Sequence, residues 1–351
     1  FEGTDGEVTG WLNGDLINEL PGAGRLFRHP GLIGIGGLNQ GSVFHTGPQN
    51  GSGNYFTGNI SELIINNRVY NAAQVNIVNN YLGAKYNIPI TNDYYDHEGQ
   101  YSWGLIGIGK EDDANLHAIA QGDGIVRMDN PSNLDNGEYL MIAHDNGELT
   151  DWSNPNVPGG DENMMRTDRI WRADDLNNAV GTVRISVDAG DLPPMPFSFS
   201  KYALLVSSSD DFSDPDQVEV FELSLNGTSG LYDADGVDLS NDKHFSLAVL
   251  NPAVEFVPAT ASGFESDTPA KTNVRLNYIN SSPVTISLGV AGGTAGETTD
   301  YTLPQTSLII PAGTGEAETD INIINDSNSE SNETIILELT SLPANHVAGV
   351  R

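Results

Sequence analysis

The sequence contains no cysteine, and only 15 of its 351 residues are lysine or arginine. Without cysteine the chain can form no disulfide, no thiolate zinc site and no cysteine nucleophile. Its 48 acidic residues leave a net charge of −33, which would repel nucleic acids and anionic membranes, because both attract proteins through lysine and arginine. No apolar run approaches the roughly 20 residues of a membrane-spanning helix. We therefore expect neither nucleic-acid binding nor direct membrane insertion.

The excess of acidic residues has two interpretations. It gives either a solvated surface suited to a salty exterior or binding sites for calcium, a hard cation that takes oxygen ligands. With 48 acids in 351 residues, two acids meet at any chosen spacing about six or seven times by chance, so a bare pair indicates nothing. We therefore treat acidic residues as candidate ligands only where a surrounding sequence pattern specifies their positions.

Short strands dominate the expected secondary structure. Val183, Ile185 and Val187 alternate with polar residues, and the same period of two recurs over 284–290 and 317–323. Turn dipeptides such as Asn-Gly lie between many of these runs. Frequent short strands with turns between them predict an all-β fold of tandem antiparallel sandwich domains.

One helix is predicted, from Ala72 to Tyr86. Asn71 can cap its N-terminus, and Gln74 stands three residues further on, as a capping box requires. Lys85 suits the negative C-terminal end of the helix dipole. One face, which we expect to pack on a sheet, carries Val75, Val78 and Leu82.

Three stretches carry family resemblances. Residues 51–88 end in a strand, a helix and a K-Y-N-I tail, and they resemble the closing segment of a laminin-G or concanavalin-like jelly roll. Residues 92–250 contain GLIGIGKEDD, DRIWRADD, YALLVSSSDDFSDPD and GVDLSNDKHFSLAV, and they resemble a β-rich module that often follows such a domain in secreted Bacteroidota proteins. Residues 253–351 contain AVEFVPATASGFES, TAGETTDYTLP and INIINDSNSESNETIILEL, and they resemble a Calx-beta domain.

These resemblances imply three domains. Residues 1–91 would be the C-terminal part of the laminin-G or concanavalin-like domain, with the helix capping its jelly-roll end. Residues 92–251 would be the β-rich sandwich-like module. Residues 252–351 would be a Calx-beta domain, an immunoglobulin-like sandwich, without its last strand. We expect both ends of the sequence to cut through domains of a much longer protein.

The Calx-beta resemblance implies a calcium site at one end of the third domain. The positions that match the family's ligands are Glu265, Asp300, Asp326, Glu330 and Glu333. Carboxylates gathered there would repel one another, and Ca²⁺, which takes six to eight oxygen ligands, would relieve the repulsion. The alternative is a solvated acidic loop that binds no ion.

Other motifs give little support to catalysis, nucleotide binding or further metal sites. Gly104–Lys110 fits G-x-x-x-x-G-K, but Glu111 replaces the Ser or Thr that reaches magnesium, which excludes a P-loop. The acid clusters 210–216 and 233–238 are expected to be polar turns. No G-x-S-x-G, H-E-x-x-H or H-x-E motif occurs, and we interpret His117, His144 and His244 as strand or turn residues. The four tryptophans are Trp11, Trp103, Trp152 and Trp171. We expect most of them to be core residues.

The resemblances indicate a non-catalytic structural or adhesive segment of a very large secreted bacterial cell-surface protein. Its role would be adhesion, gliding or assembly of a multimeric filament or hook-like appendage. The alternative is a carbohydrate-binding module, and an enzyme ranks third, because nothing marks a pair of catalytic acids. Expected partners are neighbouring domains or other copies of the chain in a homo-oligomer, and surface glycans or proteins. The expected location is extracellular, at the bacterial cell surface, with Ca²⁺ as the one bound ion.

Overall fold

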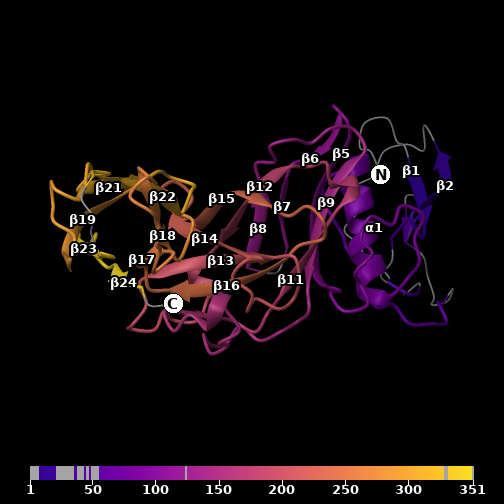
Figure 1. Cartoon of the computed structure of the whole chain (residues 1–351). Helices are drawn as coiled ribbons and strands as arrows, with labels where there is room; N and C mark the ends of the chain where they lie inside the picture. The colour runs from indigo at the N-terminus through magenta and orange to yellow at the C-terminus, as the bar shows by residue number, and fades with distance from the viewer. Residues whose placement is uncertain are drawn as a thin grey trace.

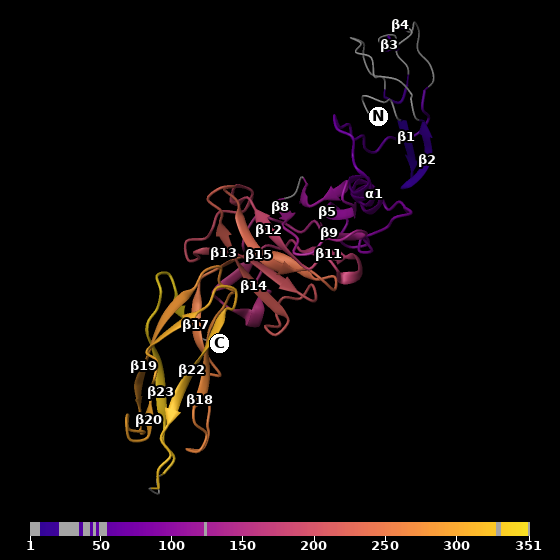
Figure 2. The same ribbon diagram turned by 90° about the horizontal axis from the view of Figure 1, so that it is seen from above.

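The computed structural model describes residues 8–20, 35–37, 43–44, 47–48, 55–122, 125–327 and 331–349. Within these ranges one α-helix, α1 (Ala72–Tyr86), accompanies 24 strands and three short 3₁₀ turns, which confirms the predicted all-β fold. The three parts of the chain follow one another in a line (Figure 1; Figure 2). No helix among the described residues is long and apolar enough to cross a membrane.

The first part contains two small hairpins. β1 (Val8–Leu12) pairs antiparallel with β2 (Asp15–Leu20), and β3 (Val43–Phe44) pairs with β4 (Gly47–Pro48). Between β1 and β2, Asn13 and Gly14 both have positive φ, of 50° and 85°, as the tight hairpin turn of an Asn-Gly pair requires. No strand occurs over the described residues 55–71, so the strand expected before the helix was wrong, and the resemblance of this part to a jelly roll stays a prediction.

Helix α1 begins and ends where the sequence predicts. The Asn71 side chain accepts the backbone N–H of Gln74 at 2.9 Å, and the Gln74 side chain accepts the Asn71 N–H at 3.1 Å, so the capping box is confirmed. Asn87 ends the helix in the left-handed conformation (φ 52°). The prediction of the packed face was wrong, because Val75, Val78 and Leu82 are only half-buried. The fully buried residues are Ala73, Asn76, Ile77, Asn80, Gly83 and Ala84.

Two asparagines explain this buried face. Asn76 Nδ2 donates to Glu111 Oε1 at 2.7 Å and to Tyr139 Oη at 3.0 Å, and Asn80 Nδ2 donates to the Asn92 carbonyl at 2.8 Å. Because these amides find partners, burying them is tolerated. The helix thereby packs against two strands of the following part, β5 (Trp103–Asp112) and β6 (Asn115–His117) (Figure 1). The domain boundaries near 91 and 251 themselves stay predictions.

The middle module (residues 103–250) is one continuous antiparallel sheet. Its strands are β5 (Trp103–Asp112), β6 (Asn115–His117), β7 (Ile119–Gln121), β8 (Val126–Asp129), β9 (Glu138–His144), β10 (Met164–Arg166), β11 (Trp171–Asp175), β12 (Thr182–Val187), β13 (Lys201–Ser207), β14 (Val218–Leu225), β15 (Tyr232–Asp238) and β16 (His244–Leu250). Three 3₁₀ turns interrupt it: η1 (Pro158–Gly160), η2 (Leu176–Asn178) and η3 (Ala189–Asp191). The strand order is β6-β5-β9-β11-β16-β13-β14-β15-β12-β8-β7, with β10 on β16, and the sheet curls until β7 contacts β5.

The inside of this curled sheet is the core of the module. Val183, Ile185 and Val187 of β12 are buried, as their alternation predicts. Trp171 is buried and stacks on Phe245, with ring centroids 5.4 Å apart and planes 4° apart, which confirms its core role. Trp152 is also buried, whereas Trp11 and Trp103 are 43% and 51% exposed, so the expectation that most of the four tryptophans are core residues was wrong.

The third domain (residues 253–348) is a sandwich of two sheets. Its strands are β17 (Ala253–Val257), β18 (Ala270–Leu276), β19 (Val284–Gly293), β20 (Tyr301–Thr302), β21 (Ser307–Ile310), β22 (Glu316–Ile323), β23 (Ile335–Ser341) and β24 (Val347–Ala348). One sheet has the order β20-β22-β18-β17-β24 and the other β21-β19-β23. The predicted alternating strands over 284–290 and 317–323 are confirmed as parts of β19 and β22.

A junction of backbone and side-chain bonds joins the third domain to the middle module. The Ile279 N–H donates to the Val220 carbonyl at 2.6 Å, and the Glu222 N–H donates to the Ile279 carbonyl at 3.1 Å. Glu222 Oε2 also accepts the Ser281 N–H at 3.1 Å and its hydroxyl at 2.9 Å, while Oε1 pairs with Lys201. Burial alone would raise the pKa of Glu222, but the hydrogen bonds from Lys201 and Ser281 outweigh it and lower this pKa.

Candidate functional site

The predicted calcium residues lie in loops at one pole of the third domain. Strand β18 reaches the junction at its C-terminal end, and β22 runs antiparallel to it, so β22 ends at the opposite pole. We call this end the loop pole, and Figure 2 shows it as the end of the molecule farthest from the middle module. The described loop-pole acids are Glu265, Asp300, Asp326 and Glu333. The fifth predicted residue, Glu330, lies outside the described residues.

Hydrogen bonds hold the loops of this pole together. The Ile324 N–H donates to the Asp300 carbonyl at 2.8 Å, and the Ile323 N–H donates to Thr268 Oγ1 at 3.1 Å. The Thr294 N–H donates to the Thr334 carbonyl at 2.9 Å, next to Glu333. The backbone thus brings together four segments that lie far apart in the sequence.

The described side chains of the loop pole do not form a chelating group. Glu265, Asp326 and Glu333 are exposed and Asp300 is half-buried. Asp300 Oδ2 accepts the backbone N–H of Gly296, inside its own loop. Among the described residues, three or more metal-ligating atoms lie within 4.8 Å of one another at a single place elsewhere in the chain. Calcium binding at the loop pole therefore stays a prediction, supported by an all-oxygen donor set that suits calcium.

That single place is a cluster of His97, Asp174 and Asp242 on the middle module. His97 Nε2 lies 3.8 Å from Asp174 Oδ2 and 3.5 Å from Asp242 Oδ2. His97 comes from the loop between α1 and β5, Asp174 from β11, and Asp242 from the turn between β15 and β16. The Ala173 N–H donates to the Lys243 carbonyl at 2.9 Å, which holds β11 beside that turn.

Several buried polar atoms around this cluster lack hydrogen-bond partners. His97 Nε2 is one of them, and the His97 side chain is 14% exposed. The Tyr95 hydroxyl is another, on a side chain that is 1% exposed and whose ring lies edge-on to His97, 5.7 Å between centroids. Glu98 Oε2 and His244 Nδ1 are also unpartnered. Because buried polar groups normally find partners, such a concentration makes this place a candidate binding site.

Burial shifts the pKa values of ionisable groups around this cluster. Burial raises the pKa of Asp174, and neighbouring Asp242 and Asp96 raise it further against the hydrogen bond that the Asp96 N–H donates to Asp174 Oδ2 at 2.8 Å. Burial, with Arg172 as the next cause, lowers the pKa of His244 to about 4. Folding therefore crowds carboxylates and the imidazoles of His97 and His244 into one partly buried volume, and both kinds of group are metal ligands.

Sequence reasoning missed this cluster, because its members stand 77 and 68 positions apart and form no local motif. Two stretches that carry the module resemblance nevertheless contain its acids: Asp174 lies in DRIWRADD and Asp242 in GVDLSNDKHFSLAV. The signal that could have pointed to the cluster was an acid beside the strand residues of each stretch. The histidine could be assigned only once the loop before β5 was placed on the sheet.

The other sequence motifs are structural. Gly104–Lys110 lies within strand β5, so its backbone belongs to a sheet ladder instead of a phosphate-binding loop. In the cluster 210–216, Asp211 Oδ1 accepts from Asn156 Nδ2 and the Ser213 N–H, both at 2.9 Å. The expectation of a turn was wrong for the cluster 233–238, which lies in strand β15, and Asp238 at the end of this strand accepts the Ser240 N–H at 2.9 Å. His117, His144 and His244 lie in strands, as expected.

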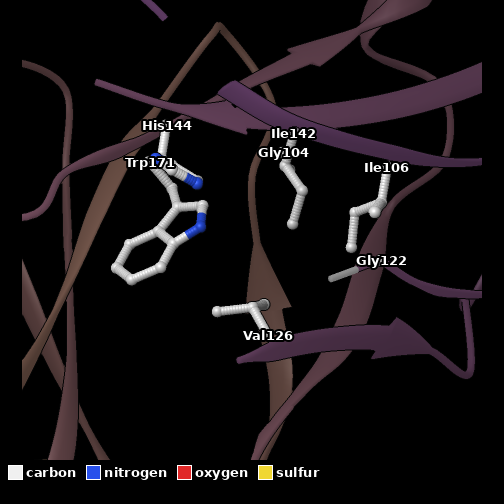
Figure 3. A pocket seen from close by; sticks show the side chains of 7 residues that line it. All are labelled: Gly104, Ile106, Gly122, Val126, Ile142, His144 and Trp171. Carbon is white, nitrogen blue, oxygen red and sulfur yellow. The ribbon is translucent and has the colours of Figure 1, made fainter. Parts of the chain in front are cut away.

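Two hollows occur among the described residues of the middle module. The first has a volume of about 10 Å³, the space of roughly one water molecule, and Figure 3 shows Ile106, Val126 and Ile142 facing it beside the Trp171 ring. A Cβ on Gly104, which has a φ of +60°, would come within 2.8 Å of His144 Nε2. This hollow is therefore a packing void too small for a substrate.

The second hollow is a surface depression of about 380 Å³ on β13, β14 and β15, beside the junction. Its charged lining residues are Lys201 and Glu222. These two pair with each other, and Glu222 also accepts hydrogen bonds from Ser281. The ionic groups of this depression are therefore already engaged in holding the junction.

Two parts of the chain match known families. Residues 74–243 match a family described as Domain of unknown function (DUF8202), and residues 250–350 match the Calx-beta domain. No curated protein and no solved structure matches the chain. The third domain is thus similar to Calx-beta domains over its whole length, and it is a β-sandwich module of a type found in extracellular proteins.

Proposed function

We propose that this chain is a non-catalytic structural segment of a large extracellular surface protein of bacteria. Its domains would act as rigid spacers that carry adhesion, gliding or an appendage. The Calx-beta similarity of residues 250–350 supports a structural module. The observation that carries the proposal is the junction, where β14 and residues 279–281 exchange backbone hydrogen bonds.

A junction with paired backbones suits a segment that must keep its modules in a fixed arrangement. Phe221 and Ile279 form a parallel bridge between the two modules, and the Glu222 carboxylate binds Ser281 on the other side of it. A flexible linker between domains has no such contacts, and relative motion is then the default expectation. Here the line of modules seen in Figure 2 is fixed by hydrogen bonds as well as by apolar packing.

Small-angle X-ray scattering of the whole chain tests this proposal. We expect an elongated particle whose scattering fits one fixed arrangement of the middle module and the third domain. Scattering that requires a broad ensemble of inter-module angles would contradict the rigid-spacer role. A glycan array provides the second test, because strong and specific sugar binding would favour the carbohydrate-binding module instead.

We also propose Ca²⁺ as the ion of the loop pole. The converging loops that carry Glu265, Asp300, Asp326 and Glu333 support this, together with the family similarity.

A further inference from the structure

We propose that His97, Asp174 and Asp242 form a site for a divalent transition metal of the Zn²⁺ class, independent of calcium binding at the loop pole. Three observations carry this inference: the spacing of the three ligand atoms, the unpartnered imidazole nitrogen between the carboxylates, and the orphaned polar atoms that surround them.

The spacing is close to that of a tetrahedral metal site. With zinc–ligand bonds of about 2.0–2.2 Å, neighbouring ligand atoms stand about 3.3–3.5 Å apart. His97 Nε2 lies 3.5 Å from Asp242 Oδ2 and 3.8 Å from Asp174 Oδ2, and each of the three residues offers a ligand atom within 4.8 Å of those of the other two. A contraction of a few tenths of an ångström brings His97 Nε2 and each carboxylate oxygen to this spacing, and side-chain torsions of Asp174 and of the part-exposed Asp242 can draw the two carboxylates toward the same ion.

The donor set selects the class of metal. An imidazole with two carboxylates suits Zn²⁺ and its neighbours among the transition metals, whereas calcium and magnesium prefer all-oxygen sites. Since the chain has no cysteine, the softer thiolate sites are excluded. Three protein ligands leave a fourth position for solvent, and Asp242, whose side chain is 43% exposed, places that position on the open side.

The surroundings already hold the ligands as an outer shell would. The Asp96 N–H donates to Asp174 Oδ2 at 2.8 Å, which fixes the carboxylate that faces His97. The buried Tyr95 hydroxyl, without a partner, is influenced by the charges of Asp174 and Glu98, so it lies close to the site. The nearby cation Arg172 is outnumbered by the carboxylates of Asp93, Asp96, Glu98, Asp174 and Asp242.

A metal here would join three segments that are distant in the sequence. The loop carrying His97 links α1 to β5, and the other two ligands belong to the sheet. The ion would therefore fasten the helix-bearing segment to the edge of the middle module. The competing explanation is a protonated His97 paired with two carboxylates, which needs no metal.

Zinc titration of the metal-stripped 351-residue chain decides between them. We expect one Zn²⁺ per chain, a higher melting temperature with zinc, and no displacement by excess Ca²⁺. Asp242→Asn and His97→Gln should each lower the zinc affinity by at least about 100-fold, more than loss of an outer-shell partner. Asn tolerates the positive φ of Asp242 (56°), so this variant keeps the turn. Asp238→Asn, which removes the same charge at the other end of the turn between β15 and β16, should bind zinc as the unsubstituted chain does.

Cobalt gives a second readout. Co²⁺ in the site should show the intense visible absorption of tetrahedral coordination, and Asp242→Asn should abolish it while circular dichroism stays unchanged. Absence of stoichiometric zinc binding by the folded chain overturns the proposal in favour of the imidazolium pair. Equal zinc affinity in the unsubstituted chain and in both ligand variants would also overturn it.

Discussion

His346 occupies the module junction as a neutral imidazole. Its Nδ1 lies 3.1 Å from the Ala344 carbonyl, which can only accept, so Nδ1 carries the proton. Nε2 then accepts the hydroxyl of Tyr278 at 3.0 Å. Burial lowers the pKa of His346, nearby Lys201 lowers it further, and the Ala344 carbonyl and Glu222 act in the opposite direction. Protonation would remove the acceptor that Tyr278 uses.

This geometry predicts acid sensitivity of the folded state. The folded pKa of His346 is below its unfolded value of about 6.5, so the unfolded chain binds the proton first. The contribution of His346 is then present above pH about 6.5 and is lost as the pH falls toward the folded pKa. In His346→Gln, the melting temperature should decline less between pH 7 and pH 5, as measured by differential scanning calorimetry. Other histidines titrate in both proteins, so equal slopes in the two would contradict this role.

At the scale of elements, α1 shows which features of a helix can be predicted from the sequence. Its ends follow from local signals, because Asn71, Gln74 and Asn87 form their caps within one turn of the helix itself. Its packed face depends on what it meets. Asn76 and Asn80 are buried because Glu111 and Asn92, far along the chain, offer them partners. Periodicity of apolar residues alone could not show this.

The two candidate metal sites differ in the same way. The acids of the loop pole stand in stretches that resemble a family motif at strand ends, so the sequence could name them as candidates, and the topology brings their loops together. The cluster of His97, Asp174 and Asp242 exists only after a loop, a strand and a turn meet. Ligands that become neighbours only through the order of strands in a sheet have no fixed spacing in the sequence, so no sequence motif identifies them.

Calcium should stabilise the loop pole by mass action. With free Ca²⁺ a hundredfold above the dissociation constant, the free energy of unfolding should rise by about 2.7 kcal/mol. The double variant Asp300→Asn with Asp326→Asn should lose the calcium-dependent rise in melting temperature while it keeps its response to zinc. Melting that is identical in calcium and in chelator would show that these acids are a solvated loop.

At the scale of the whole molecule, the junction decides whether the modules behave as one body. The sequence predicted the order of the modules from composition and resemblance, but it could not show that residues 279–281 would bond to the edge of β14. Glu222 is the side chain that secures this contact, since it binds Lys201 on its own module and Ser281 on the next. Its side chain is only 11% exposed.

Replacing Glu222 should therefore loosen the junction. In Glu222→Ala the ammonium of Lys201 and the N–H of Ser281 lose their acceptor, which should cost about 1–3 kcal/mol of stability. Hydrogen–deuterium exchange should accelerate at the Ile279 and Ser281 amides. Glu219→Ala removes the same charge from the exposed side of β14 and should leave both amides protected. If the Ile279 amide exchanges equally slowly in both variants, the backbone pairing holds the modules without the carboxylate, and the rigidity of the segment comes from the strand bridge alone.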